Sequence, residues 1–252
     1  MRQIFPGSSR HRSPEGSPGK RLYAIGDVHG CDAELAALLD LIEEDNARRA
    51  RKPTFLVYLG DLIDRGPASR EVIRRLRTAP AHFASQHVIR GNHEEMMVRS
   101  LSGEPGLIAD WLRHGGNSCA ASYGIDPSIL HDTDPDRLEH TLLSHIPKSD
   151  IDFLAGAVDQ VRFGDYLLVH AGIRPGVALA SQSGRDLRWI RGEFLASEAR
   201  HEAVIVHGHT ITESVDERPN RIGIDTGAYR TGRLTALRIE GGERSYISAG
   251  PL

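Results

Sequence analysis

Short apolar runs that end in polar residues and glycine recur along the chain and predict strands, the first two of them buried. They lie at residues 21–27, 53–61, 86–92, 165–172 and 202–210. Each run is too short for a helix of ordinary length, and each is followed by turn-forming residues. We therefore expect these segments to form the strands of one or more sheets, covered on both faces by other parts of the chain.

Segments with apolar residues at helical spacing lie between the first strands and predict amphipathic helices. Over 32–49, apolar residues from Leu35 to Ile42 recur every three or four positions. Asp32 stands near the start of this segment and is expected to cap the helix. A second helix is expected over 69–78. Strands and helices thus alternate in the first part of the chain.

The remaining segments complete an α/β pattern. Residues 94–160 are more polar and have helical spacing, so we expect a helical cap inserted between sheet strands. Residues 220–248 predict strands joined by tight turns, in antiparallel pairing. Alternation followed by hairpins indicates sheets covered by helices. We expect residues 20–252 to form a single domain after a disordered tail at 1–19, which is rich in Ser, Pro and Gly.

Composition and charge exclude several classes of function. The chain has 252 residues and a net charge of -3, which provides no field for nucleic acid or an anionic membrane. Its 2 cysteines are too few for a disulfide framework and favour a reducing, cytoplasmic setting. No apolar run could span a bilayer, and the first residues lack the apolar stretch of a secretory signal. Neither nucleic acid nor a membrane is therefore expected as a partner.

Several strand ends carry side chains able to hold metal ions. Their motifs are IGDVHG (25–30), LGDLIDRG (59–66), IRGNHE (89–94), LVHAGI (168–173) and IVHGHT (205–210). Ligands of open α/β sheets bind beyond the carboxyl ends of the strands, so these motifs point to one shared site. In an extended backbone, Asp27 and His29 project to the same side and can grip one cation. The full set of candidate ligands is Asp27, His29, Asp61, Asn92, His170 and His209.

This set contains more ligands than one ion requires. A carboxylate such as Asp61 can bridge two ions, which at about 3.5–4 Å apart activate a water molecule and clamp a phosphoryl group. Oxygen and nitrogen ligands without thiolate favour Mn, Fe, Zn or Mg. Taken singly, each residue could be a cap, a turn residue or a satisfied core residue. Taken together, they favour a dinuclear metal centre.

The motifs GDVHG, GDLIDRG, GNHE, HAGI and GHT resemble the signature of the calcineurin-like metallophosphoesterases. Within that superfamily they are similar to the phosphoprotein phosphatase branch, in its bacterial serine/threonine form. The resemblance extends over about residues 21–240 and includes the segments 111–124, 187–195 and 223–238. It implies two mixed β-sheets sandwiched between helices, with a two-metal site at one sheet edge.

The resemblance also implies how the metal ligands are shared. Asp27 and His29 would hold the first ion, and Asp61 would bridge both ions. The second ion would be held by Asn92, His170 and His209. Two divalent ions are expected, with Mn²⁺ favoured and Fe, Zn or Mg as the alternatives.

Catalytic and substrate-binding roles follow from the same resemblance. His93 would be the general acid for the leaving group, and Asp64 would orient it and keep it protonated. Arg65 and Arg191 would grip the phosphate oxygens, which guanidinium groups fit bidentately. A hydroxide held between the metals would attack phosphorus directly, so no covalent phospho-enzyme is needed.

These roles predict a hydrolase of phosphoric ester bonds that acts on phosphoserine or phosphothreonine in proteins. The alternatives are a symmetrical bis(5'-nucleosyl)-tetraphosphatase and a small-molecule phosphoesterase. The tetraphosphatase typically lacks the second Asp of its GDLIDRG-like motif, so Asp64 favours the protein phosphatase. A catalytically inactive scaffold would be expected to have lost metal ligands. The sequence leaves open the natural substrate, the native metal, the oligomeric state, the role of the tail, and any contribution of His207 or Arg90.

Overall fold

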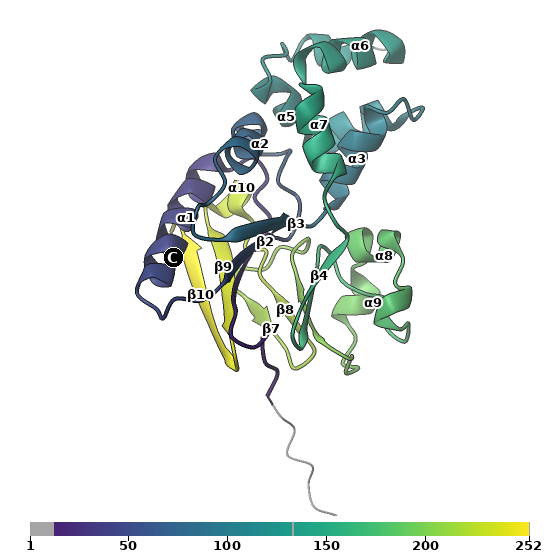
Figure 1. Cartoon of the computed structure of the whole chain (residues 1–252). Helices are drawn as coiled ribbons and strands as arrows, with labels where there is room; N and C mark the ends of the chain where they lie inside the picture. The colour runs from purple at the N-terminus through teal and green to yellow at the C-terminus, as the bar shows by residue number, and fades with distance from the viewer. Residues whose placement is uncertain (1–12, 133, 252) are drawn as a thin grey trace, which may run out of the picture.

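A mixed five-stranded sheet forms one half of the central layers in the computed structural model, which describes residues 13–132 and 134–251 (Figure 1). Its strand order is β10-β9-β1-β2-β3. The strands are β1 (Arg21–Ile25), β2 (Thr54–Tyr58), β3 (Ser85–Val88), β9 (Leu234–Glu240) and β10 (Glu243–Ala249). The neighbours β1, β2 and β3 run parallel, whereas β9 pairs antiparallel with both β1 and β10.

A second mixed sheet has the order β4-β5-β6-β8-β7. Its strands are β4 (Gln160–Phe163), β5 (Tyr166–Val169), β6 (Val204–His207), β7 (Asp216–Glu217) and β8 (Arg221–Gly223). The central strands β5, β6 and β8 are parallel, and β4 and β7 pair antiparallel at the two edges. The predicted pair of mixed sheets is therefore present.

The two sheets pack against each other through side chains that alternate along the strands. All five residues of β1 are buried. Leu22 and Ala24 belong to a core shared with Leu168 and Val206 of the second sheet. Tyr23, between them, packs in a different core on the other face, among the helices. Because successive strand residues point to opposite faces, both faces of β1 need apolar cover, which explains its continuous apolar sequence.

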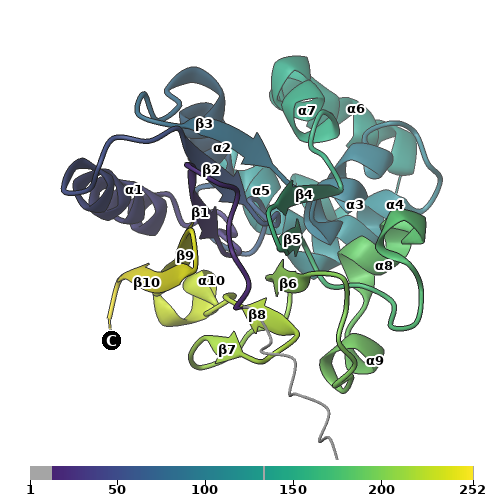
Figure 2. The same ribbon diagram turned by 60° about the horizontal axis from the view of Figure 1, so that its bottom comes forward.

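Helices cover the outer faces of both sheets. On the first sheet they are α1 (Asp32–Ala47), α2 (Ser69–Thr78) and α10 (Ala228–Thr231); on the second they are α8 (Gly184–Trp189), α9 (Gly192–Leu195) and the 3₁₀ turn Leu179–Ser181. Figure 2 shows α1 on one side of the strands and α8 and α9 on the other. Among the described helices, none is both long enough and apolar enough to cross a membrane.

A group of helices lies between β3 and β4 in the chain and projects beyond the sheets at the top of Figure 1. They are α3 (Asn92–Ser100), α4 (Leu107–Trp111), a π-helical turn (Leu112–Gly116), α5 (Asn117–Ser122), a 3₁₀ turn (Ile129–His131), α6 (Pro135–His145) and α7 (Lys148–Ala155). Helical spacing had predicted helices in this segment. The segment ends earlier than predicted, because β4 begins at Gln160.

The start of α1 differs from the expectation. The residue at the N-cap of α1 is Cys31, which makes no side-chain cap. Asp32 instead accepts two hydrogen bonds from the Arg75 guanidinium, at 2.7 and 2.8 Å. A charge-assisted bidentate pair outcompetes a cap, so this carboxylate joins α1 to α2.

Part of the predicted tail is attached to the sheets. The backbone N–H of Glu15 donates to the Asp165 carboxylate at 2.9 Å, and that of Gly16 donates to the Gly241 carbonyl at 2.7 Å. The Tyr166 hydroxyl donates to the Pro14 carbonyl at 3.2 Å. Residues 14–16 are thus held by specific hydrogen bonds, whereas residues 1–12 of the predicted tail lie outside the described residues.

Candidate metal centre

Strand ends from both sheets meet at one edge and bring the predicted ligands together. Those from the first sheet follow β1 and β2 or begin α3, and those from the second follow β5 and β6. In chain order they are Asp27, His29, Asp61, Asn92, His170 and His209, all of them buried. Residues distant in sequence therefore share one site, as the motifs predicted.

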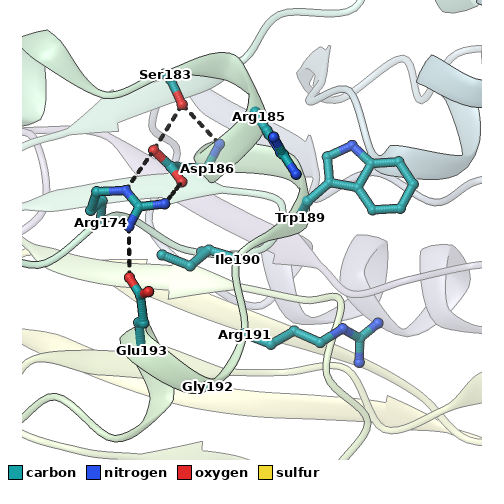
Figure 3. A pocket seen from close by; sticks show the side chains of 9 residues that line it. All are labelled: Arg174, Ser183, Arg185, Asp186, Trp189, Ile190, Arg191, Gly192 and Glu193. Atoms are coloured by element: carbon teal, nitrogen blue, oxygen red, sulfur yellow. Dashed lines mark hydrogen bonds and ion pairs between the residues drawn. The ribbon is translucent and has the colours of Figure 1, made fainter.

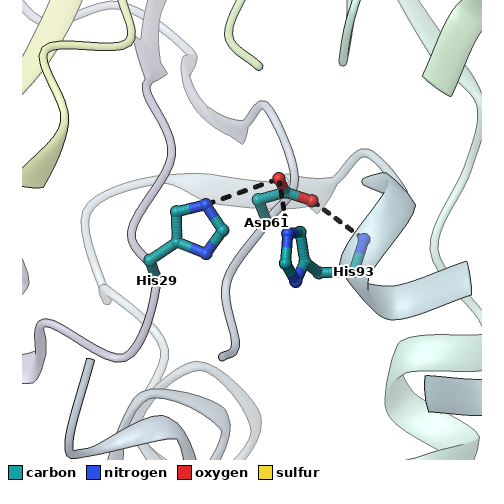
Figure 4. Close-up of side chains that lie close together, drawn as sticks. All are labelled: His29, Asp61 and His93. Atoms are coloured by element: carbon teal, nitrogen blue, oxygen red, sulfur yellow. Dashed lines mark hydrogen bonds and ion pairs between the residues drawn. The ribbon is translucent and has the colours of Figure 1, made fainter. Parts of the chain in front are cut away.

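Asp61 lies at the centre of this group. Its Oδ2 atom is 3.5 Å from Nε2 of His29, and its Oδ1 atom is 3.4 Å from Nε2 of His170 (Figure 4 shows the His29 side). One carboxylate thus faces imidazoles that come from different sheets. Two groups of ligand atoms within 4.8 Å of one another share this residue: His29, Asp61 and His93 form one, and Asp61, His170 and His209 form the other.

Backbone carbonyls fix the tautomers of two of these imidazoles. Nδ1 of His29 donates to the Ile63 carbonyl at 2.8 Å, and Nδ1 of His170 donates to the Leu59 carbonyl at 2.8 Å. The Nε2 atoms of both rings are then acceptors, as metal ligation requires. Nε2 of His170 also lies 3.0 Å from Oδ1 of Asn92, so an amide oxygen converges on the same point.

The ionisation of the histidines agrees with a ligand role for two of them. Burial lowers the pKa of His29 to about 3 and that of His209 to about 2, which keeps both imidazoles neutral. His170 behaves differently, because the adjacent Asp61 carboxylate outweighs burial and raises its pKa. Holding a cation at Nε2 of His170 requires the neutral imidazole.

Asp27 provides a test of whether a cation fits. Its Oδ2 atom accepts the backbone N–H of His209 at 3.0 Å, but its buried Oδ1 atom has no hydrogen-bond partner among the described residues. Burial and the carboxylates of Asp225 and Asp61 raise the pKa of Asp27, so the negative charges are crowded. A divalent cation would supply the missing partner and relieve the repulsion, and the oxygen and nitrogen donor set suits Mn, Fe, Zn or Mg.

His93 differs from the candidate ligands in its partners. Its Nδ1 atom is 2.6 Å from Oδ2 of Asp64, and the Trp111 indole N–H donates to the same carboxylate at 3.0 and 3.2 Å. Burial disfavours the imidazolium, but the carboxylates of Asp61 and Asp64 outweigh it and raise the pKa of His93. A protonated imidazole fits a general acid and does not fit a ligand.

The two predicted phosphate-binding arginines occupy different places. The Arg65 guanidinium is 3.0 Å from Nε2 of His29 and lies over the Tyr229 ring, 5.0 Å from its centroid. Arg191 lines a cavity next to α8 and α9. Its positive charge adds to burial and His170 in lowering the pKa of His209. Both arginines therefore act electrostatically on the candidate ligands, Arg65 from within the site and Arg191 from its margin.

Three supporting residues were not singled out from the sequence. Glu94 accepts backbone N–H groups of Asp61, Leu62 and Gly91, each at 2.8 Å, and so holds the turn after β2. Trp111 holds Asp64, and Tyr229 supports Arg65. Each of these residues lies inside one of the motifs or segments singled out in the sequence. Its residue type alone, however, did not indicate which site residue it would contact.

His207 and Arg90, left open by the sequence, have structural contacts. The His207 ring packs on Phe194 at 5.1 Å between centroids, and its Nδ1 atom lies 3.0 Å from the Gly208 carbonyl. Arg90 donates to the carbonyls of Ala155 and Ala157, at 2.5 and 3.1 Å. Neither belongs to the groups of ligand atoms around Asp61 in the described part of the chain.

Comparisons with known proteins identify the family of this chain. The family model for calcineurin-like phosphoesterases matches residues 20–230. The asymmetrical bis(5'-nucleosyl)-tetraphosphatase PrpE of Bacillus velezensis is 29% identical over 85% of this chain and 87% of its own length. The symmetrical bis(5'-nucleosyl)-tetraphosphatase of Methylococcus capsulatus is 32% identical over 89% of this chain and 94% of its own length.

Solved structures share the fold. A candidate diadenosine tetraphosphatase superposes with a TM-score of 0.65 at 20% identity, over 96% of this chain and all of that one (100%). A protein serine/threonine phosphatase from Saccharomyces cerevisiae has a TM-score of 0.53 at 13% identity, over 95% of this chain and 85% of that one. At these identities the likeness concerns the fold alone, and it confirms the predicted arrangement of two mixed sheets between helices.

Proposed function

This chain belongs to the calcineurin-like phosphoesterases, and from that premise we propose that it hydrolyses dinucleoside tetraphosphates at a dinuclear metal centre built around Asp61. The relatives at 28–32% identity that carry this activity in their names support the nucleotide substrate. They favour the alternative drawn from the sequence over the protein phosphatase that the sequence had placed first. Together with the family match, these relatives support hydrolysis at phosphorus by a metal-dependent enzyme.

The observation that carries the proposal is the position of Asp61 between two sets of ligands. One set would comprise Asp27 and His29, and the other Asn92, His170 and His209. Metal ions at such a site supply an activated water molecule and offset the negative charge of the phosphate groups. We propose manganese as the bound ion. The oxygen and nitrogen donors suit it, as they also suit Fe, Zn or Mg.

The chain's own residues would bind the substrate and deliver a proton. Arg65 offers its guanidinium to the oxygens of the phosphate that is attacked, and its contact with Tyr229 keeps it aimed into the site. His93, held at Nδ1 by Asp64, has Nε2 free to donate a proton to the departing oxygen. Nε2 lies 3.9 Å from Oδ2 of Asp61, so the acid is next to the proposed reaction centre.

One observation favours a second candidate, the hydrolysis of phosphoserine or phosphothreonine. A serine or threonine alkoxide is a poorer leaving group than a nucleoside phosphate, so its departure depends more strongly on a donated proton. The buried His93–Asp64 pair, joined at 2.6 Å and supported by Trp111, is the device that such an alkoxide needs. A phosphomonoesterase activity therefore stays as the alternative.

One side-by-side assay tests the proposal. Purified protein with Mn²⁺ is offered diadenosine tetraphosphate and, separately, a phosphothreonine peptide; nucleotides are separated by ion exchange and free phosphate is measured. We expect nucleotide products from diadenosine tetraphosphate. ADP alone would indicate symmetrical cleavage, and ATP with AMP asymmetrical cleavage. Phosphate release from the peptide without nucleotide products would contradict the proposal and support the second candidate.

The proposed compartment is the cytoplasm. Cys31 and Cys119 are both free and buried, as expected for a chain that needs no disulfide. The proposed partner is a small phosphate-containing substrate.

A further inference from the structure

A cavity of about 570 Å³ lies next to α8 and α9, on the outer side of the second sheet (Figure 3). One of its lining residues, Arg191, also acts electrostatically on the candidate ligand His209. The others include Trp189, whose side chain is unusual for a tryptophan because 38% of its surface is exposed. An exposed indole in a polar cavity calls for an explanation beyond core packing.

The Trp189 indole is fixed despite its exposure. Its N–H donates to Oε2 of Glu95 at 2.7 Å. Glu95 also accepts a hydrogen bond from Arg188 at 3.0 Å, so the carboxylate itself is held. A ring that is both exposed and immobilised loses little conformational entropy when a planar group stacks on it.

Two contacts attach this cavity to the metal centre. Glu95 lies in the first turn of α3, three positions after the candidate ligand Asn92, which corresponds to about 4.5 Å along a helix. The backbone N–H of Ala171, the residue after His170, donates to the Leu187 carbonyl of α8 at 2.8 Å. The helix that carries Trp189 is therefore joined to segments bearing two candidate ligands of the same metal set.

Positive charge is available in the cavity. Arg174 is neutralised by Asp186 at 2.6 Å and Glu193 at 2.7 Å. The guanidinium groups of Arg185 and Arg191 make no hydrogen bond or ion pair within residues 13–132 and 134–251. In Figure 3 the side chains of Trp189 and Arg191 extend away from the Arg174 network. The cavity thus offers one aromatic face and two guanidinium groups without hydrogen bonds among the described residues, although the charge of Arg185 also helps to lower the pKa of Asp186.

We propose that this cavity is a nucleotide subsite, in which the purine base of the substrate stacks on Trp189 and its phosphates bind Arg185 and Arg191. The inference rests on the proposed function and specifies how a dinucleotide would be recognised. Aromatic stacking accepts any base, and guanidinium groups bind phosphate oxygens, so the pair suits a base connected to a phosphate chain. A phosphoserine or phosphothreonine residue itself carries no planar ring that could stack on Trp189.

Binding can be tested without turnover, because the chain has 2 tryptophans and Trp111 is fully buried at 0% exposure. ADP is titrated into the metal-free protein in EDTA while tryptophan fluorescence is recorded. We expect saturable quenching by ADP, little by tripolyphosphate, which has no base, and none in Trp189→Ala. No saturable quenching in the native protein, or unchanged quenching in Trp189→Ala, would overturn the subsite.

Kinetics provide the second readout. In Trp189→Ala, KM for diadenosine tetraphosphate should rise about tenfold with kcat little changed, while hydrolysis of base-free tetrapolyphosphate stays the same. Trp189→Phe keeps an aromatic ring and should recover most of the affinity. Tyr246→Ala removes a similarly exposed ring, 37% exposed, on β10 and serves as the matched control. Equal KM values in Trp189→Ala and this control would overturn the subsite.

The two proposals fail in different ways. Quenching by ADP in a protein that cleaves no dinucleoside tetraphosphate would overturn the proposed function and retain the subsite. Cleavage of diadenosine tetraphosphate in a protein that ADP does not quench would overturn the subsite and retain the function.

Discussion

Left-handed backbone conformations at non-glycine residues mark the candidate site. Within the described residues, positive φ angles at non-glycine positions fall on His29 (46°), Asp61 (48°), Asp64 (72°), Arg65 (65°) and His209 (63°). Every one of them was a site candidate on sequence grounds. Such conformations cost about 1–3 kcal/mol each and persist only where the surroundings impose them, which is common at functional sites.

Glu94 holds the turn that contains Asp61, because its carboxylate accepts the backbone N–H groups of Asp61 and Leu62. Replacing this carboxylate should loosen the turn. Glu94→Gln replaces an acceptor with an amide N–H that faces backbone donors, so the free energy of unfolding should fall by about 2 kcal/mol. Mn²⁺ affinity should fall with it, because Asp61 is no longer held. Urea denaturation measures the free energy of unfolding, and calorimetric titration measures the Mn²⁺ affinity. Glu104→Gln removes a surface partner of Arg99 and is the control; equal effects in the two variants would contradict this role.

His93 should show its role through the leaving group. His93→Asn is expected to lower kcat on a phosphothreonine peptide about 100-fold or more, and to lower it less on 4-nitrophenyl phosphate, whose phenolate leaves without a proton. His114→Asn changes an exposed histidine and should leave both rates unaltered. Equal losses on the two substrates would argue against His93 as the acid.

The sequence predicted which side chains share the site but not how the backbone presents them. The pairing of Asp27 with His29 was argued from an extended segment, yet His29 has φ of 46° and lies in a tight turn beyond β1. Both side chains still lie in the site. Asp27 accepts the backbone N–H of His209, and the His29 ring lies beside the Asp61 carboxylate. Residue types report the chemistry of a motif, whereas the turn at His29 depends on a distant segment, because the backbone N–H groups of Val28 and His29 donate to the Asp61 carbonyl at 3.1 and 2.8 Å.

At the scale of elements, the turn at residues 111–116, kinked at Gly115, positions two catalytic candidates. Trp111, at the end of α4, donates to Asp64. Gly115 in the turn accepts the Arg65 backbone N–H at 3.1 Å. A Cβ at position 115 would lie 2.8 Å from Cγ of Arg65, and the φ of 116° disfavours any other residue. This turn therefore acts as a template for the segment that carries Asp64 and Arg65.

A pair of glycine variants tests this template. Gly115→Ala should displace Arg65 and lower kcat/KM at least tenfold. Gly106→Ala, at φ of 80° with no atom within 4 Å of its Cβ, should cost about 1 kcal/mol of stability and leave kcat/KM unchanged. Thermal unfolding and initial rates distinguish the two effects. Equal activity in both variants would show that the turn does not position Arg65.

Element type was predictable where the apolar pattern was long. The buried strands and the helices α1 and α2 follow from it, because tertiary contacts reinforce the local preference. The elements β7, α9 and α10 are too short for the hydrophobic periodicity of a strand or helix to be recognised in the sequence. The edge strand β4 has alternating exposure and was not predicted, and only its first residue, Gln160, fell within the expected helical segment.

At the scale of the whole molecule, the site lies where the two sheets meet. Asp27 from the first sheet accepts the backbone N–H of His209 from the second, and His170 from the second donates to the Leu59 carbonyl of the first. The ligands thus bridge the two halves of the sandwich. Bound cations should therefore stabilise the packing of the sheets as well as the reaction.

A cluster at the far end of β9 makes stability depend on pH. Glu240 accepts from Arg21 at 2.7 Å and from Lys52 at 2.6 Å, and these contacts lower its pKa to about 2. Because the folded pKa lies below the ordinary value of 4.5, the stabilisation is complete above about pH 4.5 and is lost as the pH falls through about 2.

Glu240→Gln should therefore reduce the free energy of unfolding by about 1–2 kcal/mol at pH 7, and by little at pH 2. Glu243→Gln, whose side chain is 76% exposed, is the control on the neighbouring strand. Urea unfolding across this pH range measures the difference. A loss that does not change with pH would contradict the ionic origin of the effect.

If Asp61 joins two metal sites, its replacement should weaken both. Calorimetric titration of Mn²⁺ into the metal-free protein and into Asp61→Asn measures this. We expect two ions per chain in the native protein and markedly weaker binding of both in Asp61→Asn. A single ion in the native protein, or two ions bound with unchanged affinity in Asp61→Asn, would contradict this expectation.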